Sequence, residues 1–134
     1  MRYLLDTHIL FWLLAKPDAL PKRAQDIIEN PSSFFSFSQI SIWEAEIKEM
    51  AKPSSIPIAP TDIPSVSKAV GLEELILKNS HIFSLPKLGL PGEVRGHKDP
   101  FDRMLLAQAL SEDMVFLTHD ANLSYYRNVK VELV

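Results

Sequence analysis

The chain has 134 residues and a formal net charge of −3, with 46% hydrophobic and 23% charged residues. This length predicts a single domain over 1–134 with a core of its own, and the composition excludes disorder, collagen and coiled coil. The absence of cysteine excludes a disulfide framework, a thiolate zinc site and a cysteine nucleophile. The slightly acidic balance offers no nonspecific attraction for nucleic acid.

Neither a membrane segment nor a common cofactor loop is predicted. The longest wholly apolar run, 9–15, is too short to cross a bilayer. Asp6 interrupts the apolar stretch that a secretory signal would need. The four glycines form neither a GxGxxG nor a GxxxxGK[ST] pattern, which disfavours dinucleotide and P-loop binding. We therefore expect a cytoplasmic protein with no membrane partner.

The first half of the chain alternates strand and helix patterns. Residues 2–6 form a short apolar segment that ends in an acid, which is typical of a strand covered on both faces. Thr7 is expected to cap the helix that follows, and Pro17 to end it. The next expected elements are a helix over 22–29, a strand over 33–38, a helix over 38–51 and a loop over 52–60.

The second half continues this alternation. Its apolar runs, prolines and glycines predict, in order, a helix over 61–70, a strand over 73–78, a short helix capped by Asn79 or Ser80, a loop over 87–98, a helix over 99–113 and strands over 114–118 and 129–134. The last of these would be an edge strand. Strands that alternate with helices predict an α/β fold built on a parallel sheet.

Two acids follow the expected strands closely. Asp6 ends the first strand, and Asp120 comes shortly after the strand over 114–118. In open α/β sheets, ligands bind outside the carboxyl ends of the strands. Asp6 and Asp120 are therefore candidate site residues.

Two further acids lie on the expected inner faces of helices. Glu44 shares the i, i+3, i+4, i+7 face of its helix with the apolar stripe Ile40, Trp43 and Ile47. Asp102 is the first position of a similar stripe formed by Leu105, Leu106 and Ala109. Because buried acids are costly unless they are paired or bound to a metal, Glu44 and Asp102 join the candidate set.

Each acid also has a structural explanation when it is taken alone. Asp99 is placed to cap the helix that Pro100 begins, and Asp102 would favour the same helix start. Asp120 can cap the segment after it in the same way. The hypothesis of a site therefore depends on the four acids together.

A cluster of carboxylates has a definite chemistry. Two such charges repel by about 4 kcal/mol at 4 Å and an effective dielectric constant of 20. Protonation or a hard cation relieves the repulsion, and oxygen ligands suit Mg²⁺ or Mn²⁺. Such a cation orients a phosphodiester, activates a water molecule and stabilises the leaving oxygen. The residues favour phosphodiester hydrolysis without a nucleophilic side chain.

Four blocks of the sequence resemble the motifs of PIN-domain ribonucleases, and most resemble the toxin half of VapBC-type toxin–antitoxin pairs. The blocks are LLDTHILFWLL at 4–14, QISIWEAEIK at 39–48, HKDPFDRMLLAQAL at 97–110 and FLTHD at 116–120. They occur in the order of the family and span nearly the whole chain. The resemblance implies a three-layer α/β/α fold whose central parallel sheet has about four or five strands.

The same resemblance implies an activity and a set of site residues. It implies an endoribonuclease that depends on Mg²⁺ or Mn²⁺, acts as a toxin, and pairs with a small VapB-like antitoxin and with a second copy of itself. By motif, the catalytic and metal-holding acids are Asp6, Glu44, Asp102 and Asp120. Asp120 matches the least strict family position. Asp99 matches a frequent family residue that we interpret as a structural cap.

Several other residues are candidates for accessory roles. Thr7 and Thr118 adjoin the strand-end acids, where they can hold a phosphate or a water molecule, or simply cap. Arg103 can contact RNA phosphate or form a surface ion pair. Lys87, Arg95, His97 and Lys98 form a mildly basic loop that is either solvated or in contact with RNA.

The helical segment over 9–14 is apolar on nearly every side, and we expect its surplus apolar surface to meet a partner, either a second copy of the chain or an antitoxin helix. Trp12 belongs to that surface, and its replacement by Glu would test whether the surface meets a partner or is core. The alternative is that the helices over 61–90 of the same chain cover it completely.

Two rival functions remain open at this point. The first is a noncatalytic PIN-like module that binds RNA or protein, although such a module would be free to lose the four acids. The second is a receiver-type phosphoacceptor domain, which would need adjacent acids after the first strand. Asp6 is followed instead by Thr7 and His8.

Overall fold

The computed structural model describes residues 1–89 and 99–134. Its described strands form one parallel sheet in the order β3-β2-β1-β4-β5. The strands are β1 (Arg2–Leu5), β2 (Phe34–Ser38), β3 (Glu73–Leu75), β4 (Val115–Thr118) and β5 (Val131–Leu133). The predicted parallel sheet is confirmed, and β5 is an edge strand, as expected.

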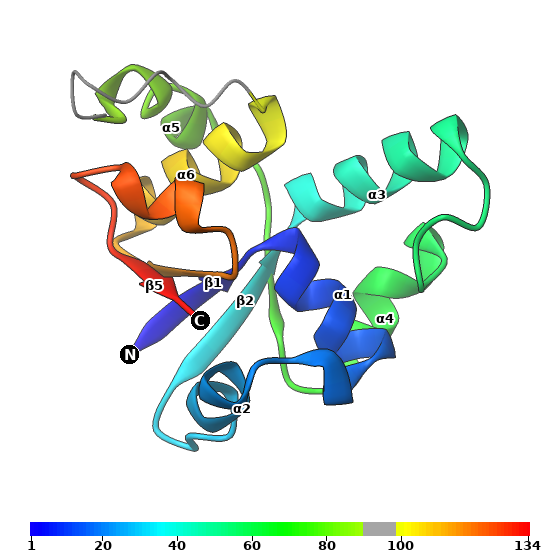
Figure 1. Cartoon of the computed structure of the whole chain (residues 1–134). Helices are drawn as coiled ribbons and strands as arrows, with labels where there is room; N and C mark the ends of the chain where they lie inside the picture. Colours follow the sequence, from blue (N-terminus) through cyan, green and yellow to red (C-terminus); the bar gives the residue numbers. More distant parts are fainter. Residues whose placement is uncertain (90–98) are drawn as a thin grey trace.

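Helices cover both faces of this sheet, which gives the predicted three-layer α/β/α architecture. They are α1 (Thr7–Ala15), α2 (Lys22–Ile28), α3 (Gln39–Ala51), α4 (Ile63–Ala69), α5 (Asn79–Ile82) and α6 (Pro100–Glu112). Figure 1 shows α1 and α4 on one side of the strands and α5 and α6 on the other. Within the two described ranges, no helix is long and apolar enough to cross a membrane.

The core is divided between the two faces because successive side chains of a strand point to opposite sides. Tyr3 and Leu5 of β1 belong to one buried cluster with side chains of α1, α2 and α4. Leu4 lies between them in sequence and belongs to a second cluster, with Leu105 and Leu106 of α6. The buried sheet therefore holds the carboxyl ends of its strands rigidly under the loops that follow them.

Two predicted helix caps are wrong. Asp6, and not Thr7, caps α1, since its side chain accepts a hydrogen bond from the Thr7 backbone N–H at 2.8 Å. Lys78 precedes α5, so neither Asn79 nor Ser80 is its cap. In both cases the helix begins one or two residues earlier than expected, directly after a residue in extended backbone conformation.

Some boundaries also differ from the expected ones. The strand expected over 73–78 ends at Leu75, and the helix expected over 61–70 begins with a short 3-10 turn, Pro60–Asp62, before α4. Asp99 caps α6 as predicted. Of the loop expected over 87–98, residues 90–98 lie outside the described residues, and Lys87 ends a short 3-10 turn, Leu85–Lys87.

The expected apolar stripe of α3 is only partly buried. Ile40 is 2% exposed, but Trp43 and Ile47 are 53% and 43% exposed, which contradicts their predicted burial. The buried face of α3 consists of Ile40, Ser41, Glu44 and Ala45. Ser41 contacts Thr7 of α1, Ala45 belongs to a core cluster, and the Trp43 ring meets the Phe101 ring of α6, so the buried face of the helix is not its most apolar stripe.

The apolar surface of α1 is largely used within the chain. Ile9, Leu10 and Phe11 are buried, and the partly buried Trp12, Leu13 and Leu14 pack against the same cluster. That cluster includes Ile63 of α4, which the alternative interpretation expected to cover this helix. Three of the exposed large hydrophobic side chains, Trp43, Ile47 and Met50, lie along α3.

Candidate active site

The strand order places two of the candidate acids at one edge of the sheet. β1 pairs with β2 on one side and with β4 on the other, so the sheet grows in opposite directions from β1. Ligands of parallel sheets bind beside such a reversal, outside the carboxyl ends of the strands. Asp6 follows β1 directly, and Asp120 follows shortly after the end of β4.

Asp6 is fixed by hydrogen bonds from both adjacent segments. Its Oδ1 accepts from the Thr7 backbone N–H at 2.8 Å, and its Oδ2 accepts from the Thr118 hydroxyl at 2.7 Å. The backbone N–H of Asp6 donates to the Leu117 carbonyl at 2.9 Å, which continues the β1–β4 pairing. The carboxylate is therefore held in one orientation at the end of two strands.

The electrostatic environment of Asp6 is unfavourable for a charged carboxylate. Burial raises the pKa of Asp6 from 3.8 to about 7, and the negative charges of Asp102 and Glu44 add to the rise. The hydrogen bonds from Thr118 and Thr7 act in the opposite direction. The charged form of Asp6 is thus disfavoured by burial and by the neighbouring acids.

Glu44 of α3 is also buried and only half satisfied. It is 7% exposed. Its Oε2 forms an ion pair with the Lys48 ammonium at 2.9 Å, one helical turn later. Its Oε1 is buried and has no hydrogen-bond partner. A buried carboxylate oxygen without a partner is costly, which indicates that a cation or a donor belongs there.

The two acids at the start of α6 have different roles. Asp99 Oδ1 accepts hydrogen bonds from the backbone N–H groups of Phe101 and Asp102 at 2.8 and 3.1 Å, which is the geometry of a helix cap. Asp102 is half-buried, and its charge reaches Asp6, as the raised pKa of Asp6 shows. Asp99 therefore caps the helix, whereas the charge of Asp102 acts on Asp6.

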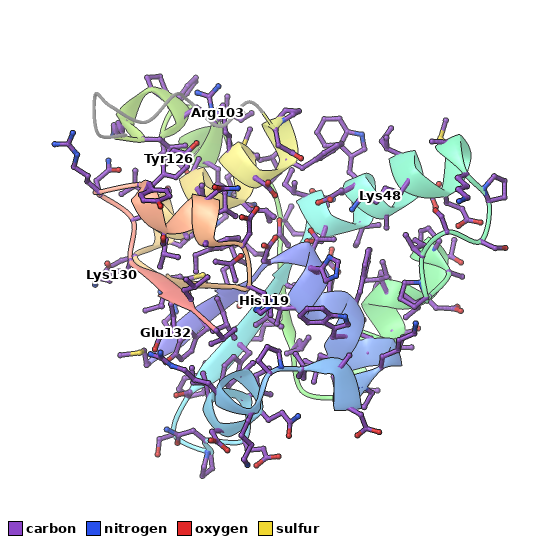
Figure 2. The ribbon with its side chains drawn as sticks, in the orientation of Figure 1. Lys48, Arg103, His119, Tyr126, Lys130 and Glu132 are labelled. Carbon is purple, nitrogen blue, oxygen red and sulfur yellow. The ribbon has the colours of Figure 1, made fainter. Side chains whose placement is uncertain are left out.

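All four candidate acids line a single pocket of about 420 Å³. The other lining residues are Thr7, His8, Trp12, Lys48, Asp99 and His119. Figure 2 shows Lys48 on α3 and His119 beyond β4, on different sides of the start of α1. In the described part of the chain, no three His, Asp or Glu side chains are already arranged as a metal-binding group. The acids are thus pocket neighbours rather than a closed set of ligands.

The predicted accessory residues differ in their placement. The Thr118 hydroxyl donates to Asp6 and accepts from the Asp120 backbone N–H at 3.0 Å, so it links two of the acids. The Thr7 hydroxyl lies 2.7 Å from that of Ser41, a buried residue of α3. Asp120 itself caps the next turn through the Asn122 backbone N–H at 2.9 Å, which agrees with its structural alternative.

Arg103 lies away from the pocket. Its side chain is exposed and does not belong to the described pocket lining. Burial raises the pKa of the Tyr126 phenol, and the nearby charge of Arg103 opposes that rise. Figure 2 shows Arg103 and Tyr126 on the opposite side of α6 from Lys48. Of the mildly basic loop, Arg95, His97 and Lys98 lie outside the described residues.

Two polar residues of the site were not singled out from the sequence. Lys48 lies four residues after Glu44, which is the spacing of an ion pair along a helix, and this signal could have identified it. Ser41 belongs to the same buried face of α3, but only the contact with Thr7 shows its position beside the site. Burial lowers the pKa of His8, and the charges of Lys48 and His119 contribute.

The residues of the pocket fit a small divalent cation. Ionisation of Asp6 is disfavoured by burial and nearby acids, and Glu44 Oε1 is a buried oxygen with no partner. Both are carboxylates, the ligand type that Mg²⁺ and Mn²⁺ prefer. A cation between them would remove the two electrostatic costs at once.

Comparison with protein families gives a match over nearly the whole chain. The model of the PIN domain family matches residues 3–129. No curated protein matches the chain. The family match thus extends from β1 to the segment before β5 and includes every candidate acid.

Solved structures with the same fold come from VapBC complexes. The chain is similar to one in VapBC2 from Rickettsia felis bound to a promoter DNA fragment, with a TM-score of 0.70, 17% identity, and coverage of 100% of this chain and 99% of that one. For VapBC-1 from nontypeable Haemophilus influenzae the TM-score is 0.67 and the identity 18%, with coverage of 99% of this chain and 98% of that one. For DNA-bound VapBC from Salmonella typhimurium the TM-score is 0.63 and the identity 18%, with coverage of 98% of this chain and 97% of that one. These likenesses show the fold.

Proposed function

The chain belongs to the PIN domain family, and on this premise we propose that it is a divalent-metal-dependent endoribonuclease formed by one domain over residues 1–134. The carrying observation is the electrostatic imbalance at the ends of β1 and β4. Asp6 has a pKa raised to about 7, and Glu44 Oε1 is buried without a partner in the same pocket. Such uncompensated carboxylates are expected in a cation-dependent hydrolase before it binds its metal ion.

Asp6, Glu44, Asp102 and Asp120 would hold Mg²⁺ or Mn²⁺, directly or through water. The ion would orient the RNA phosphodiester and stabilise the charge on the leaving oxygen. Thr118 and the Thr7 backbone N–H keep the Asp6 carboxylate in place through their hydrogen bonds. One pocket carboxylate accepts the proton of the attacking water, so no side-chain nucleophile is needed.

We also propose a toxin role with a small VapB-like antitoxin and a homodimeric state. The similar chains come from structures described as VapBC toxin–antitoxin complexes. The exposed stripe of Trp43, Ile47 and Met50 on α3 supports a protein interface, since these side chains are 53%, 43% and 74% exposed. This stripe is a better candidate for such an interface than α1, whose apolar side chains pack within the chain.

Circular RNA provides the test of an endonuclease, because a circle has no end for an exonuclease to start from. With Mn²⁺, the wild-type protein should linearise a circular single-stranded RNA, and the Asp102→Asn variant should leave it intact. Binding of the circle without cleavage, in Mn²⁺ and in Mg²⁺, would contradict the enzyme and favour the noncatalytic binding module. Asp99→Ala is the matched control, since it removes the neighbouring acid that serves as a cap.

A further inference from the structure

A groove beside the carboxylate pocket has no role in the proposed function so far. It has a volume of about 370 Å³ and lies between α1 and the segment after α3. Its lining includes His8, Trp12 and Lys48, and these three residues also line the pocket that holds the acids. The groove and the pocket are therefore neighbours across a shared wall, so one extended ligand can occupy both.

The shared wall is aromatic. The rings of His8 and Trp12, one turn apart on α1, meet edge to face with centroids 4.5 Å apart. Trp12 and His119 meet in a similar way at 5.5 Å. Trp12 is half-buried and both histidines are exposed, so the indole is held in place while part of the cluster faces solvent. An ordered aromatic surface of this kind is suited to stacking with a planar ligand.

The groove also carries positive charge, in contrast to the acidic pocket. Lys16, at the end of α1, and Lys48, on α3, both line it. The Lys48 ammonium reaches Glu44 at 2.9 Å and also lies 6.0 Å from the centroid of the Phe11 ring. It is thus held at the boundary between the acids and the groove. A ligand with an anionic group next to a planar ring therefore matches the lysines and the aromatic rings of the groove.

We propose that this groove is a nucleotide subsite, in which the RNA residue adjoining the scissile phosphate stacks its base on the Trp12 cluster and places a phosphate at Lys48. The proposal rests on the proposed function, since it places the RNA strand next to the carboxylates. Stacking is tolerant of base identity, whereas the phosphate contact fixes the position of the strand. The subsite would therefore position single-stranded RNA without selecting one base.

A nucleic acid accounts for the groove better than a protein segment does. An apolar partner would prefer the α3 stripe of Trp43, Ile47 and Met50, whose side chains are exposed and apolar. The groove instead has two lysines, Lys16 and Lys48, in its lining together with the aromatic rings, and it shares residues with the pocket that holds the carboxylates. Phosphates spaced along a strand satisfy both lysines, and the base between them contacts the rings.

Tryptophan fluorescence tests the stacking directly, because the chain has only two tryptophans. In an Asp6→Asn background, which prevents cleavage, Trp43→Phe leaves Trp12 as the sole emitter and Trp12→Phe leaves Trp43. A short single-stranded oligoribonucleotide of mixed sequence should quench Trp12 and leave Trp43 nearly unchanged. The same oligonucleotide with abasic residues should lose most of the quenching of Trp12.

Affinity measurements with matched variants give a second test. Trp12→Ala should weaken oligonucleotide binding about 5- to 150-fold, the range for loss of one base–aromatic stack. Leu13→Ala removes a partly buried side chain from the same helix and should leave the affinity within about twofold. Equal losses in both variants would assign the effect to the packing of α1 and overturn the proposal.

The phosphate contact of Lys48 has its own measurement, the dependence of binding on salt. Lys48→Met should lower the slope of log K against log salt by about 0.7, the value for one phosphate of a single strand. Lys130→Met removes the same charge on the other side of the molecule, as Figure 2 shows, and should leave the slope unchanged. Equal slopes in wild type and Lys48→Met would refute the phosphate contact.

The outcomes separate this inference from the proposed function. If RNA leaves Trp12 emission unchanged while circular RNA is still cleaved, the nuclease stands, the subsite is wrong and the groove is left to a protein partner. If RNA quenches Trp12 while no cleavage occurs with either metal, the nuclease is wrong and the base contact stands.

Discussion

Replacement of Asp6 by Asn tests the electrostatic imbalance on which the site rests. An acid whose pKa is raised in the folded state takes up its proton more readily when the protein is folded. The unfolded chain loses that proton near pH 3.8, whereas the folded chain keeps it until about pH 7. The contribution of Asp6 to stability is therefore fully favourable below about pH 4 and is lost as the pH rises to about 7.

The magnitude follows from the same pKa values. A rise from 3.8 to about 7 corresponds to a loss of on the order of 4 kcal/mol between these pH values, at 1.36 kcal/mol per pH unit. Asn is neutral at every pH and escapes this loss. It cannot accept from both Thr7 and Thr118 as the carboxylate does, which costs about 1 kcal/mol. Asp6→Asn should therefore exceed wild type by about 3 kcal/mol at pH 8 and fall slightly below it at pH 4.

Urea unfolding in EDTA at pH 4, 6 and 8 measures this difference. Asp18→Asn, which removes an exposed acid outside the pocket, is the control and should follow wild type at each pH. A constant difference between Asp6→Asn and wild type from pH 4 to 8 would refute the reasoning, because it would mean that Asp6 carries no unneutralised charge in the folded protein.

The remaining predictions concern the neighbours of Asp6 and the surface of α3. Asp99→Ala should lose about 0.5–2 kcal/mol of stability through loss of the cap and still cleave RNA, whereas Asp102→Asn should keep its stability and lose cleavage. Unfolding midpoints and cleavage rates of both variants test this. Equal loss of activity in folded samples of the two variants would contradict their different roles. Thr118→Val removes a hydroxyl that favours the charged form of Asp6, so it should raise the pKa of Asp6 further. The acidic limb of the pH–rate profile for cleavage should then shift to higher pH. An unchanged profile would contradict the role of this hydrogen bond. Trp43→Glu should remain folded, because the side chain is 53% exposed, and should lose self-association or antitoxin binding in light scattering and pull-down; unaltered association would remove the α3 stripe as an interface.

The sequence was sufficient for the parts of the site that depend on local patterns. A short apolar strand that ends in an acid locates Asp6, and the Asp-Pro start of α6 locates its cap. The parallel sheet follows from the alternation of strands and helices, and strand order then brings Asp6 and Asp120 to one edge. The first two features depend on residues within a few positions of each other along the chain, whereas the strand order comes from the structure.

Features that depend on packing between distant segments were missed. The buried face of α3 includes Ser41, which contacts Thr7, and Ala45, which joins a core cluster, and an apolar stripe at helical spacing cannot reveal this. Glu44 was found because it lies on both the expected and the observed face. The contact of Ser41 with Thr7 joins residues 34 positions apart, and only the fold brings them together.

The central claim is that the carboxylates at the ends of β1 and β4 make RNA cleavage depend on a divalent cation. Its most direct test is a titration of EDTA-stripped protein with Mn²⁺, followed by the rate of RNA cleavage in wild type and in Asp6→Asn. The account predicts no cleavage without metal, a saturable rise with Mn²⁺ in wild type, and almost no response in the variant. Equal cleavage by stripped and metal-loaded wild type would contradict it.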